Sequence, residues 1–298
     1  MMSIKRILCP TDLSSHSKSA MRYALALSRA HDAELVLLYC NTAGRPKEPR
    51  RSEVDLGLLK QIDAAELVDV RWRLLVAYAD DVGEEITHQA QIEGVDLIVM
   101  RSRRRPHRAA VLGSTAESVC RNAPCPVLVM HNDERESITD TLRIGLQRVL
   151  VAYDFSDYAE LALTYGLSLA QEHQADLHLI HVLPPRSVSD PEIAWYPSKG
   201  ESAYHTAARR LQRVVPPEVH LWCNIKNVVS EGHPYREILN YAEKNQIDLI
   251  CLGAHGVGFG MRALFGSNVD RVLRQSPCPV LVARPLKPLS LHSANQAA

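Results

Sequence analysis

The sequence lacks an excess of charge of either sign, because its 298 residues hold 34 Lys and Arg and 34 Asp and Glu. A balanced charge gives no reason to expect nucleic acid or an anionic membrane surface as a partner. Long apolar runs are also missing: runs such as LVLLYC are strand-sized and far shorter than the about 20 residues of a membrane-spanning helix. Residues 1–10 carry no apolar leader stretch. We therefore expect a cytoplasmic protein with no membrane span.

Paired metal-binding and redox motifs are absent as well. The seven cysteines stand singly, mostly inside strand-like runs, and no CxxC pair occurs, which disfavours a zinc site or a redox-active dithiol. The thirteen histidines show no HxxxH spacing. Ser156 and Ser267 have no base and orienting acid that the sequence can assign to them. We therefore expect reduced core thiols, no metal site built by the protein and no catalytic constellation.

What the sequence does contain is an internal repeat. The string PCPVLV occurs at 124–129 and again at 277–282, and the segments around Asp12 and Asp154 align with each other without a gap. Such a repeat indicates a tandem duplication, and two domains of this length fit the usual domain size. We predict domain 1 at 1–132, a linker at 133–144, domain 2 at 145–286 and a C-terminal tail at 287–298.

Each half alternates apolar strand-like runs with helical periodicity. Strands joined by helical crossovers favour a parallel, doubly wound sheet, and continuous apolar runs such as LIVM and LICL are typical of strands buried on both faces. We predict an α/β fold of two tandem Rossmann-like domains, each with a five-stranded parallel sheet and helices on both faces. In the second half the predicted strands are 147–153, 175–183, 218–229, 247–252 and 278–284, and the predicted helices are 157–173, 201–215, 234–246 and 267–275.

A glycine-rich segment follows the strand-like run IDLICL of the second half. Two residues separate Gly253 from Gly256, and nine more precede the pair Gly266-Ser267, where a helix is expected to begin. Glycines let backbone N–H groups approach an anion, and the first turn of a helix favours phosphate. Ligands of doubly wound sheets bind at this edge, beyond the carboxyl ends of the strands. The segment therefore predicts a phosphate-binding loop.

Two other phosphate motifs fit less well, and one structural alternative stays open. The chain has no GxxxxGK[ST] string, and its GVGFG string follows the fourth strand rather than the first, which disfavours a P-loop and a dinucleotide fingerprint. Ser267 with Asp270, and Ser114 with Glu117 in the first half, also match an ordinary helix capping box. On that alternative the Gly-Ser pair marks only the start of a helix.

The first half has lost the glycines of this loop. Arg101 and Arg104 stand where the first two glycines are expected, while Gly113, Ser114 and Asp12 keep their places. One interpretation is an electropositive site, formed by these five residues, for another anion such as a phosphorylated metabolite or a lipid head group. The alternative is a solvated loop balanced by nearby acidic residues, because runs of charge usually face solvent.

Each half resembles a universal stress protein domain, and the resemblance covers nearly the whole chain. It rests on PTD at Pro10–Asp12, AYD at Ala152–Asp154, the segment EGHPYREILNYAEKNQIDLICLGAHG and the ending SPCPVLVAR. Members of this family that bind ATP carry Gly, two residues, Gly, nine residues, Gly, and then Ser or Thr. The second half meets this pattern in full, whereas the first half lacks two of the glycines and is one residue shorter.

The resemblance implies an adenine nucleotide alpha hydrolase-like fold in each half and an ATP site, with magnesium, in the second. Asp154 would bind the ribose or the base, although a role at the start of the next helix stays open for it. Val182, after the second strand, would meet adenine through its backbone. Such domains also pair through their last strands, which implies an internal pseudo-dimer and leaves a further homodimer open. The implied ATP-binding residues are Ala152, Tyr153, Asp154, Val182, Gly253, Ala254, His255, Gly256, Gly266, Ser267 and Asn268.

These observations predict a cytoplasmic stress-response protein that binds one ATP in its second half. We expect it to act as a nucleotide-dependent sensor or regulator rather than as a rapid enzyme. Two alternatives stay open. One is a slow ATP hydrolase or an autophosphorylating enzyme, and the other is a small-molecule or lipid-binding protein that uses the cleft of the first half.

Overall fold

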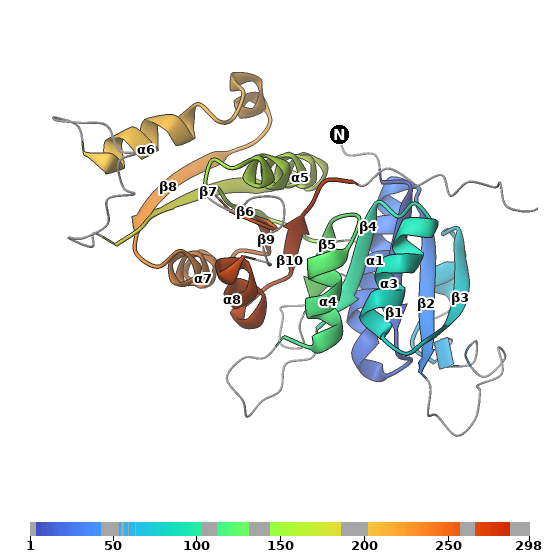
Figure 1. Cartoon of the computed structure of the whole chain (residues 1–298). Helices are drawn as coiled ribbons and strands as arrows, with labels where there is room; N and C mark the ends of the chain where they lie inside the picture. The colour runs from blue at the N-terminus through green and yellow to red at the C-terminus, as the bar shows by residue number, and fades with distance from the viewer. Residues whose placement is uncertain are drawn as a thin grey trace, which may run out of the picture.

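A single ten-stranded sheet forms the centre of the molecule, in the order β3-β2-β1-β4-β5-β10-β9-β6-β7-β8 (Figure 1). Neighbouring strands are parallel except β5 and β10, which pair antiparallel where the two halves meet. The predicted α/β class is confirmed, and the sheet as a whole is mixed. The computed structural model describes residues 4–42, 54, 57–58, 60–62, 64–102, 112–130, 144–185, 202–256 and 266–286.

The first half supplies one end of the sheet, from β1 to β5. Its apolar strands alternate with helices, as the sequence pattern predicts. The strands are β1 (Arg6–Thr11), β2 (Glu34–Thr42), β3 (Trp72–Ala79), β4 (Leu97–Arg101) and β5 (Val127–Met130). The described helices are α1 (Lys18–His31), α3 (Val82–Ile92) and α4 (Ser114–Asn122), with short 3₁₀ turns η1 (Ser15–Ser17) and η2 (Ala64–Leu67).

The second half repeats this order. Its strands are β6 (Arg148–Ala152), β7 (Asp176–Leu183), β8 (Ile225–Glu231), β9 (Leu249–Gly253) and β10 (Val280–Ala283). Its helices are α5 (Asp157–His173), α6 (Ala203–Gln212), α7 (Pro234–Lys244) and α8 (Ser267–Gln275), with a 3₁₀ turn η4 (Pro217–Leu221). The predicted linker, apart from Ile144, and the predicted tail lie outside the described residues.

The prediction of a single strand over 218–229 is wrong. The helices predicted at 157–173 and 267–275 are confirmed to the residue. By contrast, the start of the predicted strand forms the turn η4, and β8 begins only at Ile225. Pro216 and Pro217 explain the difference, because Pro217 occupies the first position of the turn, where its fixed φ and missing N–H cost nothing.

Helices cover both faces of the sheet, so its inner strands are buried on both sides, whereas the edge strands β3 and β8 are only partly buried. Apolar side chains of α1, α5 and α6 form one core with one face of the strands. Side chains of α3, α4, α7 and α8 form a second core with the other face. Both cores run across the two halves without interruption. Within the described ranges, no helix is long and apolar enough to cross a membrane.

The repeat extends to unusual backbone conformations. Leu13 and Phe155 occupy equivalent positions after the first strand of each half, and both adopt the left-handed region with φ of 59° and 66°. A second equivalent pair, Asp32 and Gln174, follows α1 and α5 with φ of 50° and 53°. Non-glycine residues rarely adopt this region, so its recurrence shows that each half reproduces the same strand-to-helix and helix-to-strand turns.

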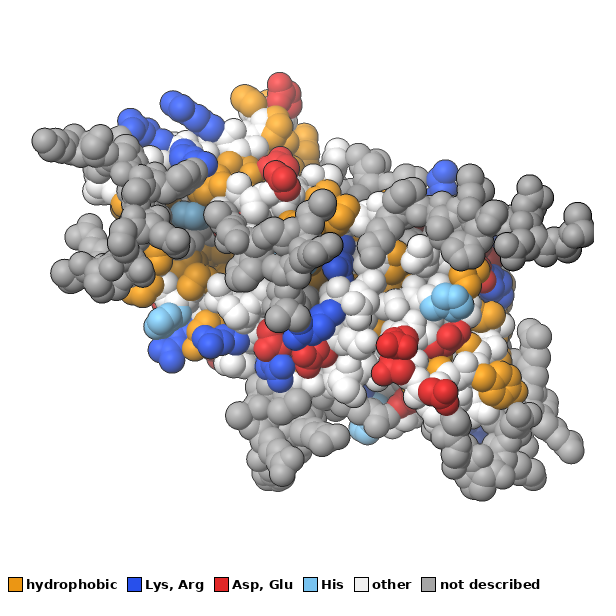
Figure 2. Space-filling view, in the orientation of Figure 1, with side chains coloured by type: hydrophobic (Ala, Val, Ile, Leu, Met, Phe, Trp, Pro, Cys, Tyr) orange, Lys and Arg blue, Asp and Glu red, His pale blue; other side chains and the backbone are white. Residues whose placement is uncertain are grey.

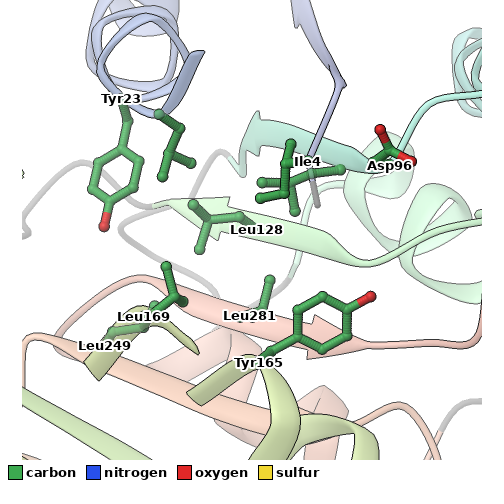
Figure 3. Close-up of a pocket in the computed structure, with 10 residues that line it drawn as sticks. Ile4, Tyr23, Asp96, Leu128, Tyr165, Leu169, Leu249 and Leu281 are labelled. Atoms are coloured by element: carbon green, nitrogen blue, oxygen red, sulfur yellow. The ribbon is translucent and has the colours of Figure 1, made fainter. Parts of the chain in front are cut away.

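The junction between the halves is built from equivalent residues. Leu281 of β10 lies opposite Leu128 of β5 in the antiparallel pair. Beside them is an apolar cavity of about 20 Å³, shown in Figure 3, into which Tyr23 of α1 and Tyr165 of α5 also project. A void of this size has room for about one water molecule, and its wall is almost entirely apolar. It is therefore a packing defect at the junction and not a ligand site.

Leu281 lies at the centre of this junction, so replacing it should weaken the contact between the halves. It is 2% exposed. We expect Leu281→Ala to lower the free energy of unfolding by about 2–5 kcal/mol, because it enlarges an existing void that the sheet cannot close. Urea unfolding followed by circular dichroism measures the loss. Leu286→Ala is the matched control, since Leu286 is 53% exposed; equal losses in the two variants would contradict the expectation.

Candidate functional site

The predicted site residues of the second half lie at the carboxyl edge of three neighbouring strands. β6 lies between β9 and β7. Asp154 comes two residues after β6, Gly253 is the last residue of β9, and Val182 is the last but one of β7. A Cβ built on Gly256 would stand 2.6 Å from Oδ2 of Asp154. The structure thus places the Asp154 carboxylate directly against Gly256.

The two ends of the glycine loop meet each other. The N–H of Gly266 donates to the carbonyl of Ala254 at 3.4 Å. Gly266 is the N-cap of α8, and Ser267 and Asn268 are its first two residues. The loop residues 257–265, between these ends, lie outside the described residues. The first turn of α8 is therefore held beside Ala254 and His255.

The capping-box alternative for this helix is wrong. Ser267 is the first residue inside α8 rather than its N-cap, and no side chain of the residues that the structure describes caps the helix. Asp270 does not reach back to the helix start, because its Oδ2 accepts a hydrogen bond from Nε of Arg274 at 2.8 Å. The equivalent helix α4 shows the same arrangement, with Gly113 as its N-cap. Within the described ranges, the first amides of both helices have no side-chain caps, which suits an anion.

Asp154 has a second task at the start of α5. Its Oδ1 accepts hydrogen bonds from the backbone N–H of Ser156 at 3.1 Å and from the Ser156 hydroxyl at 2.5 Å. Ser156 in turn caps α5 by accepting from the N–H of Ala159 at 3.2 Å. The helix-start alternative for Asp154 is therefore correct for Oδ1, whereas Oδ2 lies against Gly256. One carboxylate fixes the turn and faces the loop.

The three residues that the resemblance implies for adenine binding, Ala152, Tyr153 and Val182, differ in burial and in their hydrogen bonds. Val182 was expected to meet the base after its strand, although the predicted strand 175–183 already contains it; it lies inside β7 and pairs in register with Ser230 of β8. The strand continues past the end of β6 because β8 pairs with it as far as Leu183. Tyr153 is buried and its hydroxyl donates to Glu160 on α5. Its backbone is also engaged, because the N–H donates to the Ile180 carbonyl and the carbonyl lies 2.8 Å from Nδ1 of His181. Ala152 and Val182 are partly buried on the α7–α8 face of the sheet.

The structure shows why residue 253 must be a glycine, for a reason that the sequence alone did not reveal. A Cβ at this position would stand 2.6 Å from Cβ of Tyr158 and 2.7 Å from its backbone carbon, so α5 can pack here only against a glycine. The ring of His255 also lies against Tyr158, edge to face at 5.0 Å. Tyr158 is remote in the sequence, so no local pattern reveals these contacts. Gly253 therefore shapes the loop through packing, while Gly256 faces Asp154.

His255 presents a buried nitrogen in this site. Its Nδ1 has no hydrogen-bond partner among the described residues. Burial, and then the nearby Arg284, lower the pKa of His255 below its ordinary value. The imidazole is therefore neutral at pH 7 and needs a polar partner that the described part of the chain does not supply.

The first half contains a cleft of about 630 Å³ at the equivalent sheet edge. Its volume falls in the range of small-molecule sites. It brings together Asp12, Arg101, Gly113 and Ser114 from the predicted anion site, whereas Arg104 lies outside the described residues. Its apolar lining includes Leu38 of β2 and Ile86 of α3. These four predicted residues therefore do share one pocket.

In this cleft, side chains occupy positions that backbone groups of the glycine loop occupy in the second half. Arg101 ends β4 where Gly253 ends β9. The next residue, Ser102, accepts a hydrogen bond from the N–H of Gly113 through its hydroxyl at 3.3 Å, the role that the Ala254 carbonyl plays in the second half. Asp12 Oδ1 accepts from the hydroxyls of Ser14 and Ser17, each at 2.6 Å. The cleft keeps the Asp and the helix start but offers an arginine in place of glycine.

Metal-binding and thiol chemistry find little support in the described part of the chain. No group of three or more His, Cys, Asp or Glu side chains there could hold a metal ion. All seven cysteines are free thiols. Burial, and then Glu85, raise the pKa of Cys40, which lines the first-half cleft, to about 12. Such a thiol is a poor nucleophile at neutral pH.

The profile described as the Universal stress protein family matches residues 3–131 and 145–284. The chain belongs to the universal stress protein family. Membership supports a role in the stress response, and each half matches the profile separately. The uncapped helix start and the Asp154 site occur in the second matched segment, and the arginine-bearing cleft occurs in the first.

Relatives align with both halves of the chain. A universal stress protein of Mycolicibacterium smegmatis is 26% identical over 299 residues, which cover 94% of this chain and 97% of the relative. Universal stress protein Slr1230 of Synechocystis is 27% identical over 318 residues, which cover 94% of this chain and 100% of the relative. The crystal structure of a universal stress protein from Archaeoglobus fulgidus has a TM-score of 0.66 at 23% identity, covering 95% of this chain and 99% of that one. The structural match supports the fold.

Gly253 and Gly256 should respond differently to the same substitution. Gly253→Ala brings a Cβ into the backbone of Tyr158, and we expect a loss of about 1–3 kcal/mol in the free energy of unfolding. Among the described residues, Gly256→Ala meets only the end of the Asp154 side chain, which a small shift of that side chain accommodates, so we expect a loss below about 1 kcal/mol. Thermal unfolding measures both. Gly266→Ala is the control, because its nearest neighbour is at an ordinary 3.5 Å; equal losses at Gly253 and Gly256 would count against a structural role special to Gly253.

Proposed function

We propose that the second half binds ATP together with magnesium, and that the chain acts in the cytoplasm as a nucleotide-dependent regulator of the stress response. The contact between Asp154 and Gly256 carries the proposal. It lies beside the hydrogen bond between Gly266 and Ala254 that joins the two ends of the glycine loop. An acceptor for hydroxyl groups and a set of uncapped amides thus share one sheet edge, which suits a ligand that carries both a ribose and phosphates.

The residues present fit such a ligand. A Cβ on Gly256 would collide with Oδ2 of Asp154, so the missing side chain is what lets the loop backbone approach this carboxylate. The buried Nδ1 of His255 has no hydrogen-bond partner in the described ranges and suits a phosphate oxygen or a ligand hydroxyl. Bound magnesium would neutralise the phosphate charge and would be held largely by phosphate oxygens and water, as Mg²⁺ usually is.

Each member of the site has a role that its chemistry supports. Asp154 accepts hydrogen bonds from the ribose hydroxyls, and the backbones of Ala152, Tyr153 and Val182 line the base side. The polar groups at the two ends of the loop bind the phosphates. These phosphate-binding residues are Gly253, Ala254, His255, Gly256, Gly266, Ser267 and Asn268.

The two halves also form an internal pseudo-dimer in this proposal, with domains at 1–132 and 145–286. The antiparallel pairing of β5 with β10 supports it, because a two-fold relation requires such pairing between identical strands. The cavity beside Leu128 and Leu281 supports it further, since equivalent residues from each half line it. Whether whole chains also form a homodimer is decided by analytical ultracentrifugation.

Asp154 and Asp12 provide a matched test of the nucleotide site, because the same substitution can be made at equivalent positions. We expect Asp154→Asn to weaken binding of Mg-ATP by about 10- to 100-fold, since a charge-assisted hydrogen bond is lost. We expect Asp12→Asn to leave binding unchanged. Isothermal titration calorimetry of both variants and the wild type, with a stoichiometry near one for the wild type, is the measurement.

Three outcomes of this titration have different meanings. Absence of Mg-ATP binding to the wild type would end the proposal. Equal weakening by Asp12→Asn would move the site to the first half. A phosphate-release assay on the same samples separates a regulator from the slow ATP hydrolase or the autophosphorylating enzyme, because only turnover releases phosphate continuously.

A second candidate function is supported by the first-half cleft, which is large enough for a small molecule. Arg101 and the uncapped start of α4 favour an anionic group on that ligand, and Leu38 and Ile86 favour an apolar part. The missing glycines argue against a triphosphate here. This function belongs to the small-molecule or lipid-binding class.

Inorganic phosphate is the simplest probe of the second candidate. We expect phosphate to raise the Tm of the wild type, and the rise to be about halved in Arg101→Gln, because a binding charge is removed. Differential scanning fluorimetry gives both values. Phosphate bound by the second half contributes equally to both proteins. Arg71→Gln is the control, since the Arg71 side chain is 68% exposed on the same half; an unchanged rise in Arg101→Gln would contradict this candidate.

A further inference from the structure

Two helices that begin at different ligand edges lie side by side at the junction. α8 begins at the glycine loop of the second half, and α4 begins at the cleft of the first half. Figure 2 shows positive and negative side chains gathered between these two helices. The contacts that join the helices therefore connect elements that begin at the two sites.

Each helix carries the same charged pair one turn apart. On α4, Oε1 of Glu117 accepts a hydrogen bond from Nη2 of Arg121 at 2.8 Å. On α8, Oδ2 of Asp270 accepts from Nε of Arg274 at 2.8 Å. The two pairs are equivalent in the repeat. Both acids lie in the first turns of their helices and both arginines in the last turns.

One contact crosses between the halves and joins the two pairs. Nη2 of Arg274 lies 3.6 Å from Oε2 of Glu117, the oxygen that Arg121 does not use in its hydrogen bond. Arg274 therefore contacts the acid in the first turn of its own helix and the acid in the first turn of the other. The side chains involved are 21–30% exposed, so solvent weakens this bridge without abolishing it.

Each end of this bridge touches a ligand edge. Asp270 lies three residues after Ser267, where the second-half loop meets α8. Glu117 itself lines the 630 Å³ cleft. A second link runs in parallel, because Nη1 of Arg284, one residue after β10, donates to the carbonyl of Cys120 in α4 at 2.6 Å. Arg284 is also close enough to His255 to lower its pKa.

We propose that the Asp270–Arg274–Glu117 bridge couples the two sites, so that nucleotide binding at the start of α8 also orders the first turn of α4 at the first-half cleft. This coupling rests on the proposed function of the second half. A ligand that fixes the first turn of α8 also fixes Asp270, and through Arg274 it restrains Glu117. By linkage, a ligand in the first-half cleft changes ATP affinity by the same factor.

Hydrogen–deuterium exchange tests the coupling without a ligand for the first half. In the wild type, saturating Mg-ATP should slow exchange in residues 266–275 and also, by about two- to fivefold, in residues 114–122. In Glu117→Gln the response of 266–275 should persist while that of 114–122 is lost. Arg274→Gln should break the same bridge from the other side. Glu84→Gln, which removes an equal charge from an exposed position on α3 of the same half, should respond like the wild type.

The experiment has an arm without nucleotide. Exchange of 114–122 should become faster in Arg274→Gln, and exchange of 266–275 should become faster in Glu117→Gln, whereas Glu84→Gln should change neither. Unchanged exchange across the bridge in both variants would overturn the coupling, as would a wild-type α4 that ignores bound ATP. If calorimetry shows that Mg-ATP does not bind, the proposed function fails, while this arm still decides whether the bridge links the helices. Thermal unfolding of each variant confirms that it is folded.

Discussion

The antiparallel pairing of β5 with β10 is the constraint on which the rest of the molecule depends. All other neighbouring strands are parallel, so the carboxyl edges of the two halves face opposite ends of the sheet. The ligand edges are therefore far apart along the strands. The same pairing places α4 and α8 next to each other in opposite directions, which brings the last turn of α8 to the first turn of α4. Distant sites and adjacent helices follow from one pair of strands.

The two halves differ most at the end of the fourth strand of each half, where one has a glycine and the other an arginine. Gly253 is required by the backbone of Tyr158 in α5. In the first half, the equivalent segment is the 3₁₀ turn η1, and the α-helix α1 begins only at Lys18. The first-half backbone therefore differs in conformation at the position equivalent to Tyr158, whose backbone contacts Gly253 in the second half. Arg101 occupies the end of the equivalent strand. The loss of a glycine and the change in helix start are parts of one divergence.

The sequence predicted the elements well and the contacts between them poorly. Helices α5 and α8 follow from periodicity and from the residues at their starts, which are local signals. The Pro216-Pro217 pair was a local signal too, but the apolar residues after it favoured a strand and concealed the turn. The capping-box alternative fails because Arg274 competes for Asp270, a choice that sequence spacing alone does not settle. The Gly253–Tyr158 packing and the Arg274–Glu117 bridge join residues remote in sequence, and only the fold brings them together.

The junction strands carry nearly the same sequence, VLVM in β5 and VLVA in β10. The edge strand of each half could therefore pair with an identical strand as well as with the edge strand of the other half. Inside one chain, the covalent connection raises the effective concentration of the unlike half far above that of any other molecule. The covalent connection therefore determines which halves pair. It keeps a glycine-loop half paired with an arginine-cleft half, whereas separated halves could also form pairs of two identical halves.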